Sequence, residues 1–322
     1  MSDDARWMAQ ALALGDGARG TTAPNPNVGC VIIKDGRLVG RGATQLGGRP
    51  HAEAMALAEA GDAARGATAY VTLEPCCHQS SRGPACADLL AEAGVARVVA
   101  AMQDPWPAID GGGFERLRAA GIAVEIGIGA EEARRSMAGF LTRQQLGRPY
   151  ITLKLAMSID GRIALASGES RWITGEEARA DVHRERARAD MILVGRGTFE
   201  ADAPQLDVRL PGVEHLSPRR ALLTRGDAPS GWQRLGDPAE VFGLGDVNDL
   251  LVEGGAGAAA AFLRADLMDR LLVYRAPILI GEGRSSVNDI GLSSLADAHG
   301  RWARTETRAL GTDSREVYER LR

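Results

Sequence analysis

The chain has few cysteines and no long run of apolar residues. Its four cysteines are Cys30, Cys76, Cys77 and Cys86, three of them within eleven residues, and this layout does not suit a disulfide framework. No apolar stretch reaches the roughly 18 residues that a membrane-spanning helix needs. The N-terminus is acidic where a secretory signal would be basic. We therefore expect a cytoplasmic protein with no membrane partner. The clustered cysteines are expected to bind metal. Cys30, which lies in a predicted strand, is expected to be buried.

The sequence also lacks an excess of basic residues and is poor in aromatic ones. Lys and Arg number 38 against 42 Asp and Glu, the net charge is −4, and aromatic residues make up 4%. A surface that binds nucleic acid concentrates basic side chains on its phosphate contacts. The composition therefore predicts no nucleic-acid partner and favours a small-molecule ligand.

The length is sufficient for two hydrophobic cores. A chain of 322 residues exceeds the roughly 150 that one domain usually organises. Gly147-Arg148-Pro149 interrupts the pattern of the first half, so we place the domains at residues 1–146 and 147–322. In the first domain, the patterns predict helices at 5–19, 51–60, 86–93, 114–120 and 131–145, and strands at 28–34, 38–42, 69–73, 97–102 and 122–128. Such alternation predicts a mostly parallel sheet covered on both faces.

The second half also alternates strands and helices, but different residues mark where its elements begin and end. Thr174 and Glu177 have the spacing of a capping box for a helix that ends near Ala189. A second helix is expected at 257–264, and residues 200–218, which hold three prolines, are expected to form a loop. Strands are predicted at 150–156, 191–194, 220–224, 249–253, 271–275, 301–308 and 316–321.

His51, Cys76 and Cys86 are residue types that zinc prefers, and Glu53 follows the histidine by two residues. Three protein ligands leave one tetrahedral position open, which is typical of a catalytic zinc site. We expect each ligand to lie where a helix begins. A helix N-terminus lowers the pKa of a cysteine and so favours the thiolate, which is the form that binds metal. His-x-Glu with Pro-Cys-x-x-Cys is the pattern of zinc deaminases, in which the glutamate carries protons; here the second half of the pattern is stretched, because Cys86 follows Cys76 by ten residues.

Another interpretation is a structural site in which Cys77 or His78 supplies a fourth ligand.

Longer motifs make the sequence recognisable. Thr22-Ala23-Pro24-Asn25-Pro26-Asn27-Val28-Gly29-Cys30, His51-Ala52-Glu53 and Thr72-Leu73-Glu74-Pro75-Cys76 resemble the deaminase half of the bifunctional riboflavin-biosynthesis deaminase/reductase family. Beyond the boundary the resemblance continues through Lys154 to Arg162, Ser167 to Thr174 and Val252-Glu253-Gly254-Gly255. It covers nearly the whole chain, with the motifs in the family's order.

The resemblance implies a fold and two activities. The first domain would have a cytidine-deaminase-like α/β/α fold and would remove, with one zinc ion, an amino group from 2,5-diamino-6-(5-phosphoribosylamino)pyrimidin-4-one. The second, an α/β domain like dihydrofolate reductase, would use NADPH to reduce the ribosyl side chain to ribityl. A phosphorylated pyrimidine is then the substrate, and we expect a homo-oligomer.

Residue roles also follow from the resemblance. His51, Cys76 and Cys86 match the zinc ligands, Glu53 the proton carrier, and Asn25 a residue of the pyrimidine pocket. The family's cofactor positions fall on Ala156, Trp172, Thr198, Asp202 and the turn that includes Gly255 and Gly257. Its sugar-phosphate positions fall on Ser170, Arg186, Leu206, Arg209 and Glu253. Two arginines can fork onto a phosphate, and a glycine turn lets backbone N–H groups approach a diphosphate.

Several positions depart from the family's pattern. The loop before Cys86, with Gln79-Ser80-Ser81-Arg82, is one residue longer than usual, and Ala203 and Asp207 replace an aspartate and a threonine. Thr44 stands where a histidine is common. Arg225 follows a predicted strand where the family often has a serine, and we hypothesise that it pairs with the 2′-phosphate of NADPH.

Two other functions remain open from the residues alone. One is a nucleobase or nucleoside deaminase, with tRNA as one candidate substrate and with a non-catalytic second domain. The other is a zinc-stabilised binding or regulatory protein, in which Glu53 would be idle.

Overall fold

The structure, a computed structural model, describes residues 2–78 and 82–322. The chain forms two compact units that divide after Gly147. Each unit has its own sheet and its own buried apolar core. The described residues include no helix that is both long and apolar enough to cross a membrane.

The first unit is built on one mixed sheet. In chain order its strands are β1 (Gly29–Lys34), β2 (Arg37–Ala43), β3 (Thr68–Val71), β4 (Arg97–Ala100) and β5 (Ala123–Ile126), and their order across the sheet is β2-β1-β3-β4-β5. Strands β3, β4 and β5 are parallel, but β1 pairs antiparallel with both neighbours. The expectation of a mostly parallel sheet therefore holds only for β3, β4 and β5; β1 and β2 form the antiparallel hairpin that an Asp-Gly turn between two strands indicates. Cys30 is fully buried in β1, as expected.

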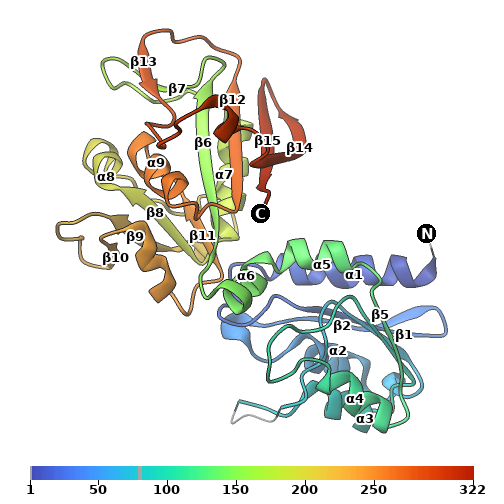
Figure 1. Cartoon of the computed structure of the whole chain (residues 1–322). Coiled ribbons are helices and arrows are strands. Elements are labelled where there is room, and N and C mark those ends of the chain that lie inside the picture. Colours follow the sequence, from blue (N-terminus) through green and yellow to red (C-terminus); the bar gives the residue numbers. More distant parts are fainter. Residues whose placement is uncertain (1, 79–81) are drawn as a thin grey trace. The chain divides into compact units, whose positions relative to one another are not determined.

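Helices cover both faces of this sheet. Helices α1 (Asp3–Gly17) and α5 (Ala130–Ser136) lie on one face, and α2 (Ala52–Ala60), α3 (Cys86–Glu92) and α4 (Gly112–Ala119) lie on the other (Figure 1). The single helix expected over 131–145 is instead α5 and α6 (Ala138–Leu146), since the backbone leaves helical geometry at the buried Met137.

Helix α2 lies directly against β2 because two glycines of β2 face the helix. A Cβ atom at Gly42 would lie 2.3 Å from the carbonyl oxygen of Ala52, and one at Gly40 would lie 2.2 Å from that of Ala56. Both distances are far below van der Waals contact. The two glycines therefore set the position of α2, which carries His51 at its N-cap and Glu53 in its first turn.

The second unit has a longer sheet whose strands are mostly parallel. Its order is β10-β9-β8-β11-β6-β12-β15-β14, and all neighbours from β10 to β12 are parallel. The strands are β6 (Tyr150–Ser158), β8 (Met191–Gly195), β9 (Arg219–Leu223), β10 (Trp232–Leu235), β11 (Asp249–Val252), β12 (Arg270–Ala276), β14 (Trp302–Leu310) and β15 (Asp313–Arg320). Strands β7 (Arg162–Leu165) and β13 (Gly283–Ser285) form a separate pair. The sequence did not predict β7, β10 or β13.

Three helices accompany this sheet: α7 (Glu176–Ala187), α8 (Arg196–Asp202) and α9 (Ala256–Arg264). The capping box expected at Thr174 is wrong, because the N-cap of α7 is Gly175 and no side chain caps the helix. The backbone N–H of Gly175 instead donates to Asp313 Oδ2 at 2.6 Å. Helix α8 ends within the segment from residue 200 that was expected to be loop.

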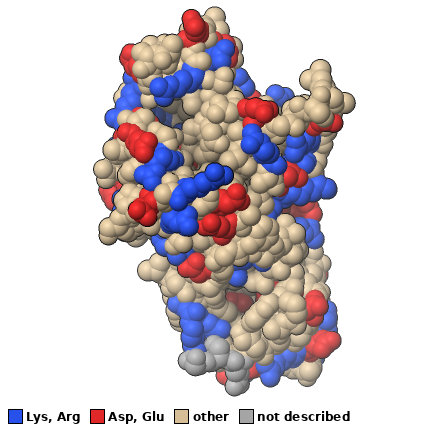
Figure 2. All heavy atoms as spheres, turned by 60° about the vertical axis from the view of Figure 1, so that its left-hand side comes forward, with Lys and Arg blue, Asp and Glu red and all other residues tan. Residues whose placement is uncertain are grey.

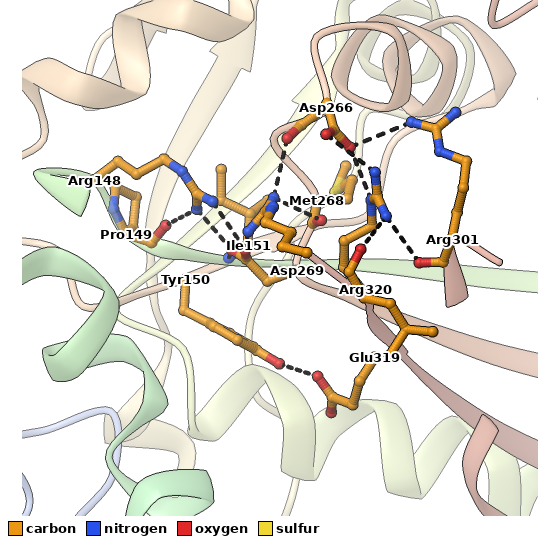
Figure 3. A network of polar contacts seen from close by, with 12 residues as sticks. Arg148, Pro149, Tyr150, Ile151, Asp266, Met268, Asp269, Arg301, Glu319 and Arg320 are labelled. Carbon is orange, nitrogen blue, oxygen red and sulfur yellow. Dashed lines mark hydrogen bonds and ion pairs between the residues drawn. The ribbon is translucent and has the colours of Figure 1, made fainter. Parts of the chain in front are cut away.

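A buried carboxylate network anchors the start of β6. Asp269 accepts hydrogen bonds from Arg148 Nη1 at 2.7 Å, Arg148 Nη2 at 2.9 Å and the backbone N–H of Ile151 at 2.9 Å (Figure 3). Arg322 also pairs with it. Only 4% of the Arg148 side chain and 6% of that of Asp269 are exposed, so breaking this pair would leave an uncompensated buried charge.

Charged side chains are intermingled on the surface. On the face that Figure 2 shows, Lys and Arg side chains lie beside Asp and Glu side chains. Arg219 and Asp246 are an example, with 2.7 Å between Nη1 and Oδ2 and more than half of each side chain exposed.

Candidate functional sites

The three predicted zinc ligands lie together in the first unit. The Nδ1 atom of His51 is 3.3 Å from Cys86 Sγ and 3.6 Å from Cys76 Sγ. Tetrahedral zinc with ordinary bond lengths separates a nitrogen from a sulfur ligand by about 3.6 Å. The three ligand atoms all lie within 4.8 Å of one another, so the donor set and its spacing fit zinc.

The two thiols lie within 4.8 Å of each other. Hydrogen bonds from the Cys86 thiol and from His51 hold the pKa of Cys76 below its ordinary value, and the backbone N–H of Cys86 donates to Cys76 Sγ at 3.3 Å. Cys86 begins α3, as expected, but Cys76 lies in a segment without helical structure. The expectation that a helix N-terminus lowers the pKa of each cysteine is therefore wrong: the pKa of Cys76 is lowered by its partners in this cluster, and that of Cys86, which does begin a helix, is raised by the hydrogen bond with Cys76 and by burial.

Glu53 is buried beside the thiols. Only 3% of it is exposed, and burial raises the pKa of its carboxyl above the ordinary range. The Cys86 thiol is one of its hydrogen-bond partners. A buried carboxyl of raised pKa, two residues from His51, is suited to accept and return a proton.

Asn25 lies beside His51 of this cluster. Its Nδ2 atom is 3.3 Å from His51 Nε2 and donates to the carbonyl oxygen of Gly48 at 3.0 Å. Gly48 has φ of 85°, and a Cβ atom there would lie 2.5 Å from Asn25 Cγ. The turn at Gly48 therefore leaves space for the Asn25 side chain, which a Cβ atom there would displace.

The other two candidate ligands point elsewhere. The ring of His78 packs edge-on against Trp106 with 5.1 Å between centroids. The Cys77 thiol is directed toward the carbonyl oxygen of Ala108, 3.9 Å away. Among the described residues only His51, Cys76 and Cys86 form a possible metal cluster. The extended loop predicted between Cys76 and Cys86 includes residues 79–81, which lie outside the described residues.

Glu74 is a site residue whose role the sequence did not reveal. It is 3% exposed and precedes the metal-ligand segment by two residues. Its Oε2 atom accepts the N–H groups of Asp104 at 3.2 Å and Gly111 at 3.0 Å, and Oε1 accepts those of Gly113 at 2.8 Å and Phe114 at 3.4 Å. The carboxylate thus fixes the loop between β4 and α4 beside Cys76. The sequence feature that could have identified Glu74 is its position as an acidic residue between an apolar strand and Pro75.

The second unit contains a cavity of about 1110 Å³ at the carboxyl ends of its parallel strands. Pockets for small ligands usually measure about 300 to 1,000 Å³, so this one has room for a dinucleotide and a substrate. Every cofactor and sugar-phosphate position expected from the sequence lines it: Ala156, Ser170, Trp172, Arg186, Thr198, Asp202, Leu206, Arg209, Glu253, Gly255 and Gly257.

A glycine turn between β11 and α9 forms one wall. The backbone N–H of Gly255 donates to Thr198 Oγ1 at 2.9 Å, and a Cβ atom at Gly255 would lie 3.0 Å from the same oxygen. A Cβ atom at Gly254 would lie 2.4 Å from that of Ala258. The turn therefore exposes bare backbone at a helix N-terminus, which is the arrangement that binds a dinucleotide diphosphate.

A buried ion cluster forms another wall. Glu253 is 6% exposed and accepts from Arg186 Nε at 2.7 Å and Nη2 at 3.0 Å, while Lys154 Nζ lies 3.5 Å away. Burial alone would raise the pKa of Glu253, but Lys154 and Arg186 lower it to about 2. Arg186 thus forks onto Glu253, and its Nη1 donates to the carbonyl oxygen of Asp207 at 2.9 Å.

The other residues predicted to contact a ligand in this cavity differ in how much of each side chain is exposed. Trp172 is 65% exposed, with the Arg179 guanidinium 4.8 Å from the centre of its ring. Arg209 is 61% exposed and pairs with Asp207 at 3.5 Å. Arg225 is exposed and is not among the residues that line the cavity.

Comparison with known proteins agrees with both sites. Residues 1–102 match the family described as the cytidine and deoxycytidylate deaminase zinc-binding region. Residues 149–232 and 242–314 match the RibD C-terminal domain. The cytidine-deaminase-like and dihydrofolate-reductase-like folds expected for the two domains are thereby confirmed.

Full-length relatives cover nearly all of the chain. The riboflavin biosynthesis protein RibD of Escherichia coli K12 is 42% identical over 92% of this chain and 94% of its own. That of Mycobacterium tuberculosis H37Rv is 44% identical over 92% of this chain and 91% of its own.

Two solved structures cover 99% of this chain and of their own. Acinetobacter baumannii RibD has 38% identity and a TM-score of 0.90. The Thermotoga maritima protein, named as a diaminohydroxyphosphoribosylaminopyrimidine deaminase/5-amino-6-(5-phosphoribosylamino)uracil reductase, has 30% identity and a TM-score of 0.91. This chain belongs to the RibD family of riboflavin biosynthesis, the bifunctional enzymes that join a zinc-binding deaminase domain to an NADPH-dependent reductase domain.

Proposed function

We propose that His51, Cys76 and Cys86 bind the zinc ion and that Glu53 is the proton carrier of the deaminase. The distances among the three ligand atoms and the burial of Glu53 beside them support these assignments. Zinc, when bound, makes water more acidic. Two thiolates neutralise much of the metal's charge and weaken that effect, so a nearby base is needed.

The substrate that we propose is 2,5-diamino-6-(5-phosphoribosylamino)pyrimidin-4-one. Water adds to the amino-bearing ring carbon, and Glu53 takes one of its protons. Glu53 then gives a proton to the departing nitrogen, ammonia leaves, and a carbonyl group remains on the ring. Asn25, which lies against His51 at the cluster, would contact the pyrimidine.

In the second domain we propose that NADPH reduces the ribosyl group of the deaminated product to ribityl. Bound NADPH would supply a hydride to the sugar carbon that bears the amine; the bond from that carbon to the ring oxygen would break, and a proton would convert that oxygen to a hydroxyl. The cofactor would contact Ala156, Trp172, Thr198, Asp202 and the turn with Gly255 and Gly257. The substrate would contact Ser170, Arg186, Leu206, Arg209 and Glu253. That all of these residues line one cavity is the observation that carries this assignment.

Within that cavity, we infer that Arg209 makes the more adaptable phosphate contact. Its side chain is 61% exposed, whereas 11% of Arg186 is exposed and its fork is held by Glu253. Arg209→Gln should raise the KM of the phosphorylated substrate with little change in kcat. Arg219→Gln, a half-exposed arginine whose partner is Asp246, is the matched control. Equal KM values for the two variants would contradict this assignment.

The deaminase assignment is tested by separating the two reactions. Glu53→Gln should lower ammonia release by roughly 100-fold or more, because an amide cannot carry the proton. Zinc content and NADPH oxidation with the deaminated intermediate should stay at wild-type values. Glu59→Gln, on the exposed side of the same helix, is the control. Wild-type ammonia release by the zinc-loaded Glu53→Gln protein would refute the role of Glu53.

The same assay separates the other functions that the sequence left open. A nucleoside deaminase would act without the phosphoribosyl group and would oxidise no NADPH, and a binding protein would release no ammonia. The expected homo-oligomer and cytoplasmic location stay predictions; light scattering at several protein concentrations tests the first.

A further inference from the structure

Arg196 occupies a position in the reductase cavity to which the assignments above give no role. It follows β8 directly, and its side chain reaches across to the end of β9. There its Nε and Nη2 atoms donate to Thr224 Oγ1 at 3.2 and 3.0 Å, and Nη2 also donates to the carbonyl oxygen of Asp227. Arg196 lines the cavity, and 36% of its side chain is exposed.

Neighbouring strands place this arginine beside the glycine turn. Strands β11, β8 and β9 are adjacent and parallel, so their carboxyl ends follow one another along one edge of the sheet. A Cβ atom at Gly254 would lie 3.6 Å from the backbone nitrogen of Gly195. Adjacent strands are about 4.8 Å apart. A dinucleotide whose diphosphate lies on the glycine turn therefore has its adenosine ribose within reach of Arg196 when it extends toward β9.

The partners of Arg196 leave its charge available for a ligand. Lys154 and Arg186 are held by the buried Glu253, and Arg209 pairs with Asp207. The hydrogen bonds of Arg196 go to a hydroxyl and a carbonyl oxygen, which are neutral. Its acidic neighbour Glu200 is 64% exposed and 3.7 Å away, which makes a weak, solvent-screened pair.

We propose that Arg196 binds the 2′-phosphate of NADPH and so selects this cofactor over NADH. Thr224 and the Asp227 carbonyl orient the guanidinium through Nε and Nη2. Within the described part of the chain Nη1 makes no hydrogen bond, so its N–H groups can meet the phosphate. Arg225, the residue that the sequence suggested for this role, is exposed beside the same loop but does not line the cavity. The proposal rests on the use of the large cavity for NADPH.

The test measures ligand binding to the full-length, zinc-loaded protein by calorimetry. The probes are NADPH, NADH, 2′,5′-ADP and 5′-AMP, and the variants are Arg196→Gln and the matched control Arg225→Gln. For Arg196→Gln, affinity for NADPH and 2′,5′-ADP should fall roughly 10- to 100-fold, which is the usual effect of losing a charge-assisted hydrogen bond. NADH and 5′-AMP should bind within about twofold of wild type, and Arg225→Gln should bind all four ligands unchanged.

Arg196→Lys supplies a second variant that keeps the charge. It should retain part of the preference for 2′,5′-ADP over 5′-AMP, because lysine keeps a point charge but loses the planar fork. Equal losses for NADPH and NADH in Arg196→Gln would mean that Arg196 only supports the loop, and would overturn the proposal. So would a selective loss of 2′,5′-ADP in Arg225→Gln alone. If the wild-type protein bound neither NADPH nor 2′,5′-ADP, the assignment of the cavity itself would fall.

Discussion

Replacing Glu74 with glutamine removes the charge from a carboxylate that accepts four backbone N–H groups. Each oxygen of the carboxylate accepts two of these bonds. In glutamine one oxygen becomes an NH₂ group, which would face two N–H donors, so two acceptor positions are lost. The loop between β4 and α4 then loses half of what holds it beside Cys76.

The size of the effect follows from those contacts. A hydrogen bond to a charged group contributes about 1.5 to 3 kcal/mol. One bond of each pair is longer than the other, at 3.4 Å on Oε1 and 3.2 Å on Oε2, so we take the lower value for each. Loss of either pair should therefore destabilise the first unit by about 3 kcal/mol.

Urea unfolding of the zinc-loaded protein measures this change. Because the chain has two units, circular dichroism should be combined with zinc release to a chromogenic chelator, which follows the first unit alone. Glu132→Gln is the control, since Glu132 is 59% exposed in a pair with Arg135 and should change stability by less than about 0.5 kcal/mol. If Glu74→Gln matched this control in both signals, Glu74 would not hold the loop.

Three further changes test other parts of the structure by the same unfolding measurement. Asp269→Asn should destabilise the second unit by about 3 kcal/mol and leave zinc release unchanged, because it leaves the buried charge of Arg148 without its partner; an unchanged urea midpoint would contradict this. Gly42→Ala should cost the first unit about 2 kcal/mol or more, since the new Cβ would meet the Ala52 carbonyl. Gly17→Ala, which meets nothing within 4 Å, is its control. The third change concerns pH: the pKa of Glu253 is lowered to about 2 in the folded protein, so its stabilising effect should be complete above the ordinary glutamate pKa and disappear as the pH falls toward 2. Glu253→Gln should abolish that acid dependence, and an unaltered pH profile would refute the ion cluster.

The metal centre could be predicted from sequence because its chemistry is local. Zinc needs a particular set of side chains, and a histidine at a helix start with cysteines flanking a short loop supplies that set within a few elements. The sheet arrangement was harder to predict. Strands β7, β10 and β13 are three or four residues long, and their pairing depends on partners far away in the chain, which periodicity does not report.

Glu74 and the N-cap of α7 are single positions whose contacts were hard to predict for the same reason. The partners of Glu74 lie 30 to 40 residues further along the chain and are all backbone groups, which leave no mark in the sequence. Thr174 has the spacing of a capping box, but Asp313 reaches the start of α7 from a distant strand and binds the backbone of Gly175. In both cases the hydrogen-bond partner lies far away in the chain, whereas sequence rules look for it among neighbouring residues.

The ion cluster around Glu253 changes how the reductase cavity attracts its substrate. The sequence suggested two free arginines for a phosphate, yet Arg186 is held by Glu253 and the cluster with Lys154 has a net charge of about +1. A free buried arginine would lose hydration without compensation, whereas the paired one keeps its position at a lower cost. Arg186 is therefore a fixed wall of the cavity. Its charge contributes to the potential of the site, and the direct contact with the phosphate is the one that we propose for the exposed Arg209.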